Sequence, residues 1–393
     1  MTSSSSLPVS SSRLEHPICF WIGVLDGCLF VTYLLKFDQA YFYVASIAIK
    51  LILIEVTRQR NSNAAVWSAV PFTVLLLTSE TISGLLNELE WLAYIKVIVF
   101  SLNILATLNF VSEKYWRGLF LANVANGAIY LVMFQTGRIE NVFGRYSYYN
   151  LVHPNLGSEL LFGAAFAGLL GRRPKLLVLG LPFIFLPVFL MQGRAAELGI
   201  AAIASICGAY IFRRLGLEAQ AAILVLLAVA VSVFLLYVDL GTLVSKLLLL
   251  DDKYRGEGTD ASGRSAYWGT AIQVWLDYPF FGAGSSYPSR LGVLQAHNFF
   301  LYGLADYGLL GAVLLSVFLF QLGSVALAGY WQLVLPLIPM LIFNDRFINL
   351  NTYPTVMFLF VFAYFARSRP SKRKLTSEVK VASGLEAKNS VGT

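Results

Sequence analysis

The sequence predicts an all-α protein that crosses a membrane many times. Only 13% of its 393 residues are charged, whereas soluble domains usually carry about a quarter. A further 57% are hydrophobic, and the mean hydropathy is +0.68. Apolar blocks recur along the whole chain, and each is about 20 residues long, as a membrane-spanning helix requires. These blocks are continuous rather than alternating, which argues against a β-barrel.

The apolar blocks predict about twelve helical spans, each long enough to cross the hydrocarbon layer. They lie at 17–35, 39–57, 64–79, 91–111, 118–135, 156–171, 175–191, 195–212, 219–239, 298–320, 323–343 and 352–367. A Ser-rich segment, 1–16, precedes them and is expected to be a disordered tail without a signal peptide. A basic tail, 368–393, follows, so that 17–367 form one transmembrane domain.

Basic residues predict the orientation of these spans. They gather in alternate connections, at Arg58 and Arg60, Lys114 and Arg117, Arg172, Arg173 and Lys175, Arg213 and Arg214, and in the C-terminal tail. The positive-inside rule makes that side cytoplasmic and places both termini there. The net charge of +7 therefore indicates membrane orientation rather than nucleic-acid binding. The remaining connections, including the one with Glu80, Glu88 and Glu90, belong outside.

Two of the outer connections are long, at about 135–155 and 241–297. In the second, residues 265–277 have the spacing of an amphipathic helix, and Pro279, Gly282 and Gly284 favour a sharp turn after it. The apolar side is expected to comprise Tyr267, Trp268, Ala271, Ile272, Trp275 and Leu276. This side could lie in the lipid headgroup layer or pack on the outer ends of neighbouring helices.

Three basic residues, Arg194, Arg264 and His297, are predicted to share the outer face. Charge is costly at a membrane, so a cluster of it usually marks a functional site. A guanidinium suits phosphate oxygens, and Arg264 would stand at a helix N-terminus, which itself favours anions. A histidine is the usual general base near neutral pH. Each residue alone also has an ordinary explanation: a snorkelling arginine, a loop charge paired with Asp260, or a histidine at a helix end.

Several motifs are missing from the sequence. There is no Walker loop, no Asp-x-Asp pair and no zinc-binding His/Glu pattern in the outer loops. We therefore expect neither a metal nor another cofactor. Without a metal, a diphosphate leaving group would have to be stabilised by arginines.

Four motifs occur in order between about 150 and 345: Gly263 to Trp268, Pro279 to Gly284, His297 to Leu301, and Asp306 to Gly311. Together they resemble the O-antigen ligase/polymerase superfamily, as does an upstream arginine after a small residue, here Arg194. The departure from the family pattern is Gly193, where a serine is common.

The resemblance implies a GT-C-like membrane glycosyltransferase with one large periplasmic loop, here 241–297, that contains short amphipathic helices. It would act without metal on the periplasmic side of a bacterial inner membrane and invert the anomeric carbon. The donor would be a glycan on undecaprenyl diphosphate, and the acceptor a sugar hydroxyl of lipid A–core or of another glycan. Arg194 and Arg264 would hold the diphosphate and His297 would act as the base. Asn298 and Arg290 are further candidates for substrate binding.

Three alternatives to an O-antigen ligase remain open. A polymerase of O-antigen or exopolysaccharide would use the same chemistry on another acceptor. A protein O-oligosaccharyltransferase usually carries an additional soluble domain. A transporter of polyprenyl-linked glycans would need paired charges within the bilayer, and the predicted spans contain few, Lys96 being the main exception.

Overall fold

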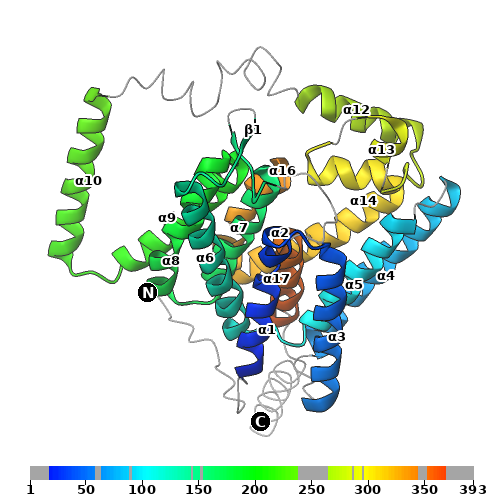
Figure 1. Cartoon of the computed structure of the whole chain (residues 1–393), viewed down its shortest axis with the longest axis horizontal. Helices are drawn as coiled ribbons and strands as arrows, with labels where there is room; N and C mark the ends of the chain where they lie inside the picture. Colours follow the sequence, from blue (N-terminus) through cyan, green and yellow to red (C-terminus); the bar gives the residue numbers. More distant parts are fainter. Residues whose placement is uncertain are drawn as a thin grey trace, which may run out of the picture.

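The computed structural model describes residues 17–57, 63–87, 91–142, 145–150, 154–237, 264–285, 287–293, 296–343 and 352–368. The predicted tail at 1–16, most of the tail at 368–393 and the connection at 238–263 lie outside these residues, as do Glu88 and Glu90. Within them the protein is almost entirely helical (Figure 1).

The first half of the chain forms ten helices and one small hairpin within the described residues. They are α1 (Pro17–Gly27), α2 (Phe30–Leu34), α3 (Gln39–Thr57), α4 (Asn63–Leu86), α5 (Trp91–Thr107), α6 (Glu113–Gln135), β1 (Asn141–Val142), β2 (Arg145–Tyr146), α7 (Pro154–Leu170), α8 (Pro174–Met191), α9 (Arg194–Phe212) and α10 (Leu217–Tyr237). The antiparallel β1–β2 hairpin is the exception to the all-α prediction among the described residues.

The second half begins with two helices of the long connection, α12 (Arg264–Asp277) and α13 (Tyr287–Leu291), and continues with α14 (Phe299–Val325). A short irregular series follows: the π-helix η2 (Ala326–Tyr330), α15 (Trp331–Val334), the 3-10 helix η3 (Leu335–Leu337) and α16 (Ile338–Phe343). The last described helix is α17 (Thr352–Ser368). Gly329, with a φ of +93°, allows the chain to reverse direction within this series.

Seven segments of the described chain are long and apolar enough to cross a membrane. They are Pro17–Leu34, Gln39–Thr57, Ala64–Leu86, Glu113–Gln135, Pro174–Met191, Arg194–Phe212 and Phe299–Phe343, and shorter apolar helices lie at Tyr94–Thr107, Leu217–Leu226 and Pro354–Ser368. The protein is therefore an all-α, multi-pass membrane protein, as predicted. Helical structure occurs at each of the twelve predicted segments, but twelve crossings and the sidedness of the loops stay predictions.

Two helices form the centre of the bundle. α17 contacts α7 on one side and α4, α5 and α14 on the other, whereas α7 also contacts α6, α8 and α9. Nearly all side chains of α7 are buried, as are those of α17 from Val356 to Phe365. A helix that is apolar all round belongs inside a bundle, so α7 and α17 join the two groups of helices (Figure 1).

α4 is longer than the sequence predicts. It continues past residue 79 to Leu86, so Glu80 lies within the helix and is buried instead of occupying an outer connection. Its carboxylate accepts hydrogen bonds from Tyr307 Oη (2.7 Å) and Ser285 Oγ (2.7 Å). A buried carboxylate needs such donors, and here they come from α14 and from the connection before it.

A buried ion pair joins the N-terminal helices. Lys50 Nζ of α3 lies 2.6 Å from Asp26 Oδ1 of α1, and the lysine side chain is completely buried. Lys50 also donates to Asn103 Oδ1 (2.8 Å) and Thr107 Oγ1 (2.8 Å) of α5, while Tyr115 Oη of α6 donates to Asp26 Oδ2 (2.9 Å). The expectation that Lys96 is the main charge within the spans is therefore wrong: Lys96 is exposed, whereas Lys50, Glu159 and Asp306 of three other predicted spans are buried.

The predicted amphipathic helix is confirmed as α12, and it packs against α14. Ala271 and Val274 are its buried residues, whereas Ile272 and Leu276 are exposed. The buried side is thus offset from the predicted one, since Val274 takes part and Ile272 does not. Packing on a neighbouring helix accounts for the buried side, and the exposed apolar residues remain available to lipid.

The turn after α12, at residues 279–284, docks on α14 through hydrogen bonds between backbone groups. The amide groups of Ala283 and Gly284 donate to the carbonyl oxygens of Ala305 (2.8 Å) and Asp306 (2.9 Å). In return, the amide of Leu309 donates to the carbonyl oxygens of Pro279 (2.8 Å) and Phe280 (3.0 Å). We call this region, 279–284 with 305–309, the backbone junction.

The backbone junction requires glycine at two positions. α14 is kinked at Gly308, which has a φ of +57° and a ψ of −132°. A Cβ at Gly308 would lie 2.6 Å from both the Gly282 nitrogen and the Pro279 oxygen, and a Cβ at Gly282 would lie 2.2 Å from the Asp306 oxygen. Two of the motifs seen in the sequence are therefore the two halves of one structural contact.

Replacing Lys50 with methionine should destabilise the protein, because it leaves the buried Asp26 carboxylate without its cation. We expect a loss of about 3–5 kcal/mol in the free energy of unfolding, the usual cost of removing one partner of a buried ion pair. Unfolding of the purified protein in detergent measures it. The double variant Asp26→Asn/Lys50→Met should recover most of this loss, and Lys96→Met serves as the exposed-lysine control. A Lys50→Met protein as stable as the wild type would contradict the assignment.

Replacing Gly308 with alanine should separate the 279–284 turn from α14, because the methyl group overlaps the backbone of the turn. We expect a destabilisation of about 1–3 kcal/mol from the overlap together with the positive φ. Gly323→Ala is the matched control in the same helix, since a Cβ there meets no atom within 4 Å. Thermal unfolding in detergent compares the two variants, and equal midpoints would show that the junction does not constrain α14.

Candidate active site

The junction of α8 and α9 places Arg194 at the start of α9. Gln192 ends α8 in the left-handed conformation, with a φ of 52°, and Gly193 precedes the first residue of α9. A Cβ at position 193 would lie 2.3 Å from both Cβ and Oγ of Ser158 in α7. The glycine that departs from the family pattern therefore has a packing reason: the Ser158 side chain occupies the space that a serine at position 193 would need.

A second arginine, Arg145 of β2, holds this junction in place. Its Nε donates to the carbonyl oxygen of Met191 (2.9 Å), and its Nη2 donates to the carbonyl oxygen of Gln192 (2.9 Å) and to Asn155 Oδ1 (2.7 Å). Carbonyl groups at a helix C-terminus have no partner within the helix, and a buried guanidinium satisfies them. Sequence reasoning missed Arg145, because a single arginine in a loop rich in tyrosine, asparagine and glycine carries no recognisable pattern.

The loop around Arg145 is itself anchored to α6. Tyr148 Oη and Tyr149 Oη both donate to Asn126 Oδ1, at 2.9 Å and 2.7 Å. Burial raises the pKa of both tyrosines, so both phenols keep the protons that these bonds require. The hairpin and the α8–α9 junction are thereby held at the same end of the bundle.

Two guanidinium groups and one carboxylate of the described residues interact at the junction. Glu197, in the first turn of α9, is within electrostatic range of both Arg194 and Arg145. Arg194 is half-buried, so its charge is partly removed from water and interacts more strongly than a surface charge would. This group of residues carries a net positive charge, which suits an anionic ligand.

His297 lies just before α14 and contacts α12. Its φ is +46°, and its ring lies 5.5 Å from the ring of Tyr267, centroid to centroid, with 40° between the planes. Tyr267 stands in the first turn of α12, which begins at Arg264, and the Arg264 side chain itself is not among those that the structure describes. The packing of α12 on α14 therefore brings the start of α12 close to the His297 imidazole.

The two further candidates have structural roles. Asn298 caps α14, because its Oδ1 accepts from the amides of Phe300 (3.0 Å) and Leu301 (3.0 Å), and its Nδ2 donates to the carbonyl oxygen of Ile342 (3.1 Å). The Arg290 guanidinium donates to the carbonyl oxygens of Asn87 and Ala283. These contacts fix the last turn of α13 and the start of α14, and substrate binding by either residue stays a prediction.

The helices that begin at Arg194 and at Phe299 start at the same end of the bundle, near the hairpin, α12 and α13 (Figure 1). α16 contacts both α9 and α14 and lies between them. A guanidinium and an imidazole at one end of a membrane bundle can bind a phosphate group and accept a proton, respectively. Among the described residues, no three His, Cys, Asp or Glu side chains are grouped as metal ligands would be.

Comparison with known families agrees with this geometry. Residues 176–316 match the O-antigen ligase family, and this stretch runs from α8 into α14 and contains Arg194, Arg264, Arg290, His297 and Asn298. None of the curated proteins matches the chain. The matched region holds every residue that the sequence singled out for the site, and the match supports the predicted resemblance to the O-antigen ligase/polymerase superfamily.

Proposed function

We propose that this protein is a metal-independent, inverting glycosyltransferase that acts on a lipid-linked donor at the periplasmic side of a bacterial inner membrane. The donor is a glycan on undecaprenyl diphosphate and the acceptor is a sugar hydroxyl of lipid A–core, so the activity is that of an O-antigen ligase. One observation carries the proposal: the O-antigen ligase match spans Arg194, Arg264 and His297, and the helices α9, α12 and α14 begin at or next to these residues.

The proposed reaction is a displacement at the anomeric carbon of the donor sugar. The acceptor oxygen forms the new bond to this carbon as the bond to the diphosphate oxygen breaks, and the configuration inverts. His297 takes the proton of the acceptor hydroxyl, and undecaprenyl diphosphate leaves with the electron pair. Fixed guanidinium groups stabilise the charge that builds on the diphosphate in the transition state.

The contacts of His297 support its role as the base. Its ring packs against Tyr267, and its neighbour Asn298 is tied to both α14 and α16. A general base has to be held within hydrogen-bonding reach of the proton that it removes. The backbone junction fixes α12 on α14, and so helps to hold the His297 ring in place without using the side chains of His297 or Tyr267.

The distribution of basic residues supports the proposed orientation. Arg172, Arg173, Lys175, Arg213 and Arg214 stand at the ends of α8 and α9 opposite to Arg194. The positive-inside rule assigns that end to the cytoplasm. The opposite end, with Arg194 and His297, then faces the periplasm, where lipid-linked glycans are transferred.

The buried pair of Asp26 and Lys50 is the observation closest to the transporter alternative. Its charges are, however, bonded to Asn103, Thr107, Tyr115 and Ser46. A pair with this many fixed partners acts as a structural tie between helices, and it lies outside the region that matches the O-antigen ligase family. We therefore favour transfer over transport.

Alanine at Arg194, Arg264 or His297 should reduce glycan transfer to near background. Loss of a general base costs about 10²–10⁴-fold in rate, and loss of one electrostatic stabiliser about 10²–10³-fold. The measurement is the rate of product formation by each purified variant in detergent. Arg194→Lys keeps the charge without the bidentate geometry and should retain part of the activity.

Arg138→Ala is the matched control for these variants, since Arg138 is an exposed arginine of the first outer loop. Each variant is also checked for monodisperse elution and an unchanged unfolding midpoint. Near-normal transfer by the His297→Ala protein would remove His297 from the role of base.

The identity of the product decides between ligase and polymerase. We expect the purified enzyme, given an undecaprenyl-diphosphate-linked glycan and lipid A–core, to form a glycosylated lipid A–core. The donor alone should give no chain extension. Extension of the donor glycan without lipid A–core would identify a polymerase instead. If neither product forms while lipid-linked glycan crosses the bilayer of proteoliposomes, the protein is a transporter.

A further inference from the structure

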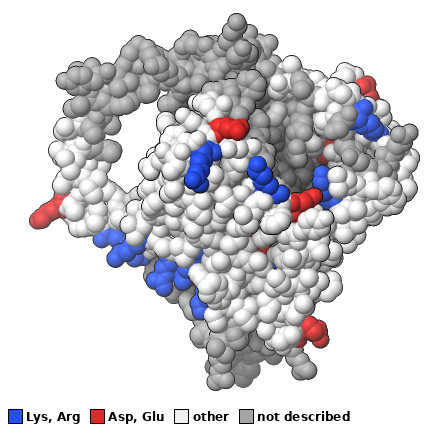
Figure 2. All heavy atoms as spheres, in the orientation of Figure 1, with Lys and Arg blue, Asp and Glu red and all other residues white. Residues whose placement is uncertain are grey.

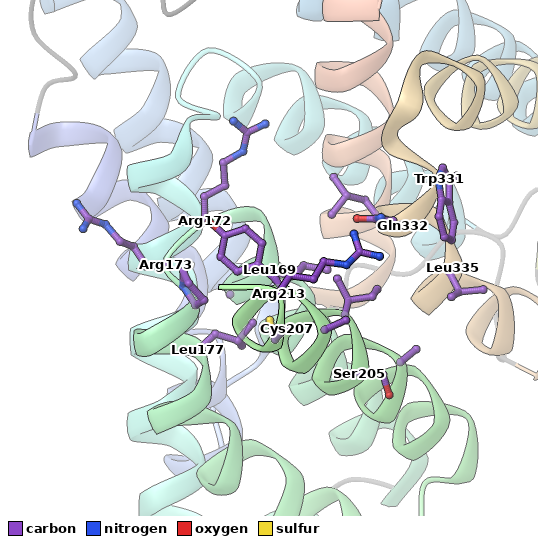
Figure 3. Close-up of a pocket in the computed structure, with 17 residues that line it drawn as sticks. Leu169, Arg172, Arg173, Leu177, Ser205, Cys207, Arg213, Trp331, Gln332 and Leu335 are labelled. Carbon is purple, nitrogen blue, oxygen red and sulfur yellow. The ribbon is translucent and has the colours of Figure 1, made fainter. Parts of the chain in front are cut away.

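A cavity of about 700 Å³ opens at the end of the bundle away from the candidate active site. Arg194 begins α9 and Arg213 follows its last residue, so the two lie roughly 28 Å apart along the helix at 1.5 Å per residue. The cavity is lined by the second half of α9, the start of α8, the end of α7 and the α15–η3 segment. Its inner wall is apolar and includes Leu169, Leu177, Ala202, Cys207, Leu333 and Leu335 (Figure 3).

Three arginines stand at the rim of this cavity. Arg172, Arg173 and Arg213 all line it and are all exposed. Arg172 Nη1 lies 3.6 Å from Glu113 Oε1, whereas neither Arg173 nor Arg213 forms an ion pair with any other residue that the structure describes. Figure 2 shows basic side chains gathered on this flank, where α9 ends and α10 begins. The rim therefore carries positive charge that is not neutralised by the described part of the chain.

The rim combines this charge with an aromatic residue. In Figure 3 the Arg213 guanidinium extends toward Gln332 and Trp331, across the cavity from its own helix, while those of Arg172 and Arg173 point away from it. Trp331 is 57% exposed. Tryptophan is enriched where membrane meets water, which places Arg213, Gln332 and Trp331 at the headgroup level and the apolar wall below them.

A cationic rim over an apolar cavity at a membrane boundary matches one class of molecule. We propose that the cavity binds an anionic phospholipid of the leaflet at this end of the bundle. The phosphate contacts Arg213, and an acyl chain lies against Leu177 and Cys207. Arg173 adds electrostatic attraction from the rim. The volume is within the range of small-molecule sites, and basic pockets between membrane helices are suited to acidic lipid headgroups.

Quenching of Trp331 fluorescence by brominated lipids tests this site on the full chain in phosphatidylcholine vesicles. The Trp331 signal is the difference between the wild type and Trp331→Phe. We expect brominated phosphatidylglycerol to quench it at a lower mole fraction than brominated phosphatidylcholine does. Arg213→Ala should reduce the preference for phosphatidylglycerol about five-fold, the effect of one charge near a membrane surface.

Lys175→Ala is the matched control, because Lys175 is exposed at the same end and does not line the cavity. It should leave the preference unchanged, and both variants should unfold at the wild-type temperature. An unchanged preference in Arg213→Ala would overturn the proposal. Relief of quenching by inorganic phosphate would overturn it by identifying a soluble phosphate site. If cross-linking traps dimers in which Trp331 is protected equally from quenching by both brominated lipids, the occupant is a second copy of the chain and the proposal is likewise wrong. The readout needs no glycan transfer, so its result is independent of the proposed enzymatic function.

Discussion

The backbone junction between the 279–284 turn and α14 determines where the long connection before α14 meets the bundle. Four hydrogen bonds between main-chain groups form it, and they are possible only because Gly308 bends α14 and Gly282 brings the turn within contact of the Asp306 carbonyl. Main-chain groups at the edge of a membrane must find hydrogen-bond partners. Here the 279–284 turn and α14 supply these partners for each other. The consequence is that α12 is fixed on α14, and the Tyr267 ring is held against His297.

Side-chain polarity inside the bundle follows the same rule. Glu80 of α4 accepts bonds from Ser285 and Tyr307, and Asn87, at the end of α4, donates to the Gly282 carbonyl oxygen. Through Glu80 and Asn87, α4 therefore also contacts the backbone junction, in addition to the turn and α14 that form it. The Asp26–Lys50 pair likewise joins α1, α3, α5 and α6 through bonds to Asn103, Thr107 and Tyr115. Because an unsatisfied polar group in lipid is costly, these contacts specify which helices can be neighbours.

The two ends of α9 lie at two different sites, the candidate active site at its start and the apolar cavity at its end. At its start, Arg145 satisfies the last carbonyl groups of α8, and so leaves Arg194 at the head of α9 beside Glu197. At its end, Arg213 stands on the rim of an apolar cavity with Trp331. Arginine serves both ends because its charge persists at any physiological pH and its planar fork binds phosphate oxygens. Both ends of α9 lie within residues 176–316, which match the O-antigen ligase family. The ligand proposed for each end is different.

Hydropathy alone determined the all-α membrane class, and helical structure is present at all twelve apolar segments. Local signals also predicted α12, the turn after it, and the positions of Arg194 and His297 next to helix starts, because caps, glycines and apolar periodicity are properties of neighbouring residues. Only the tertiary structure decided the burial of Glu80, whose partner Tyr307 is 227 residues away, the pairing of Asp26 with Lys50, and the role of Arg145. The physical reason is that an isolated charge in a sequence has the same hydropathy whether it is exposed or paired. Its partner becomes defined only when helices distant along the chain pack together.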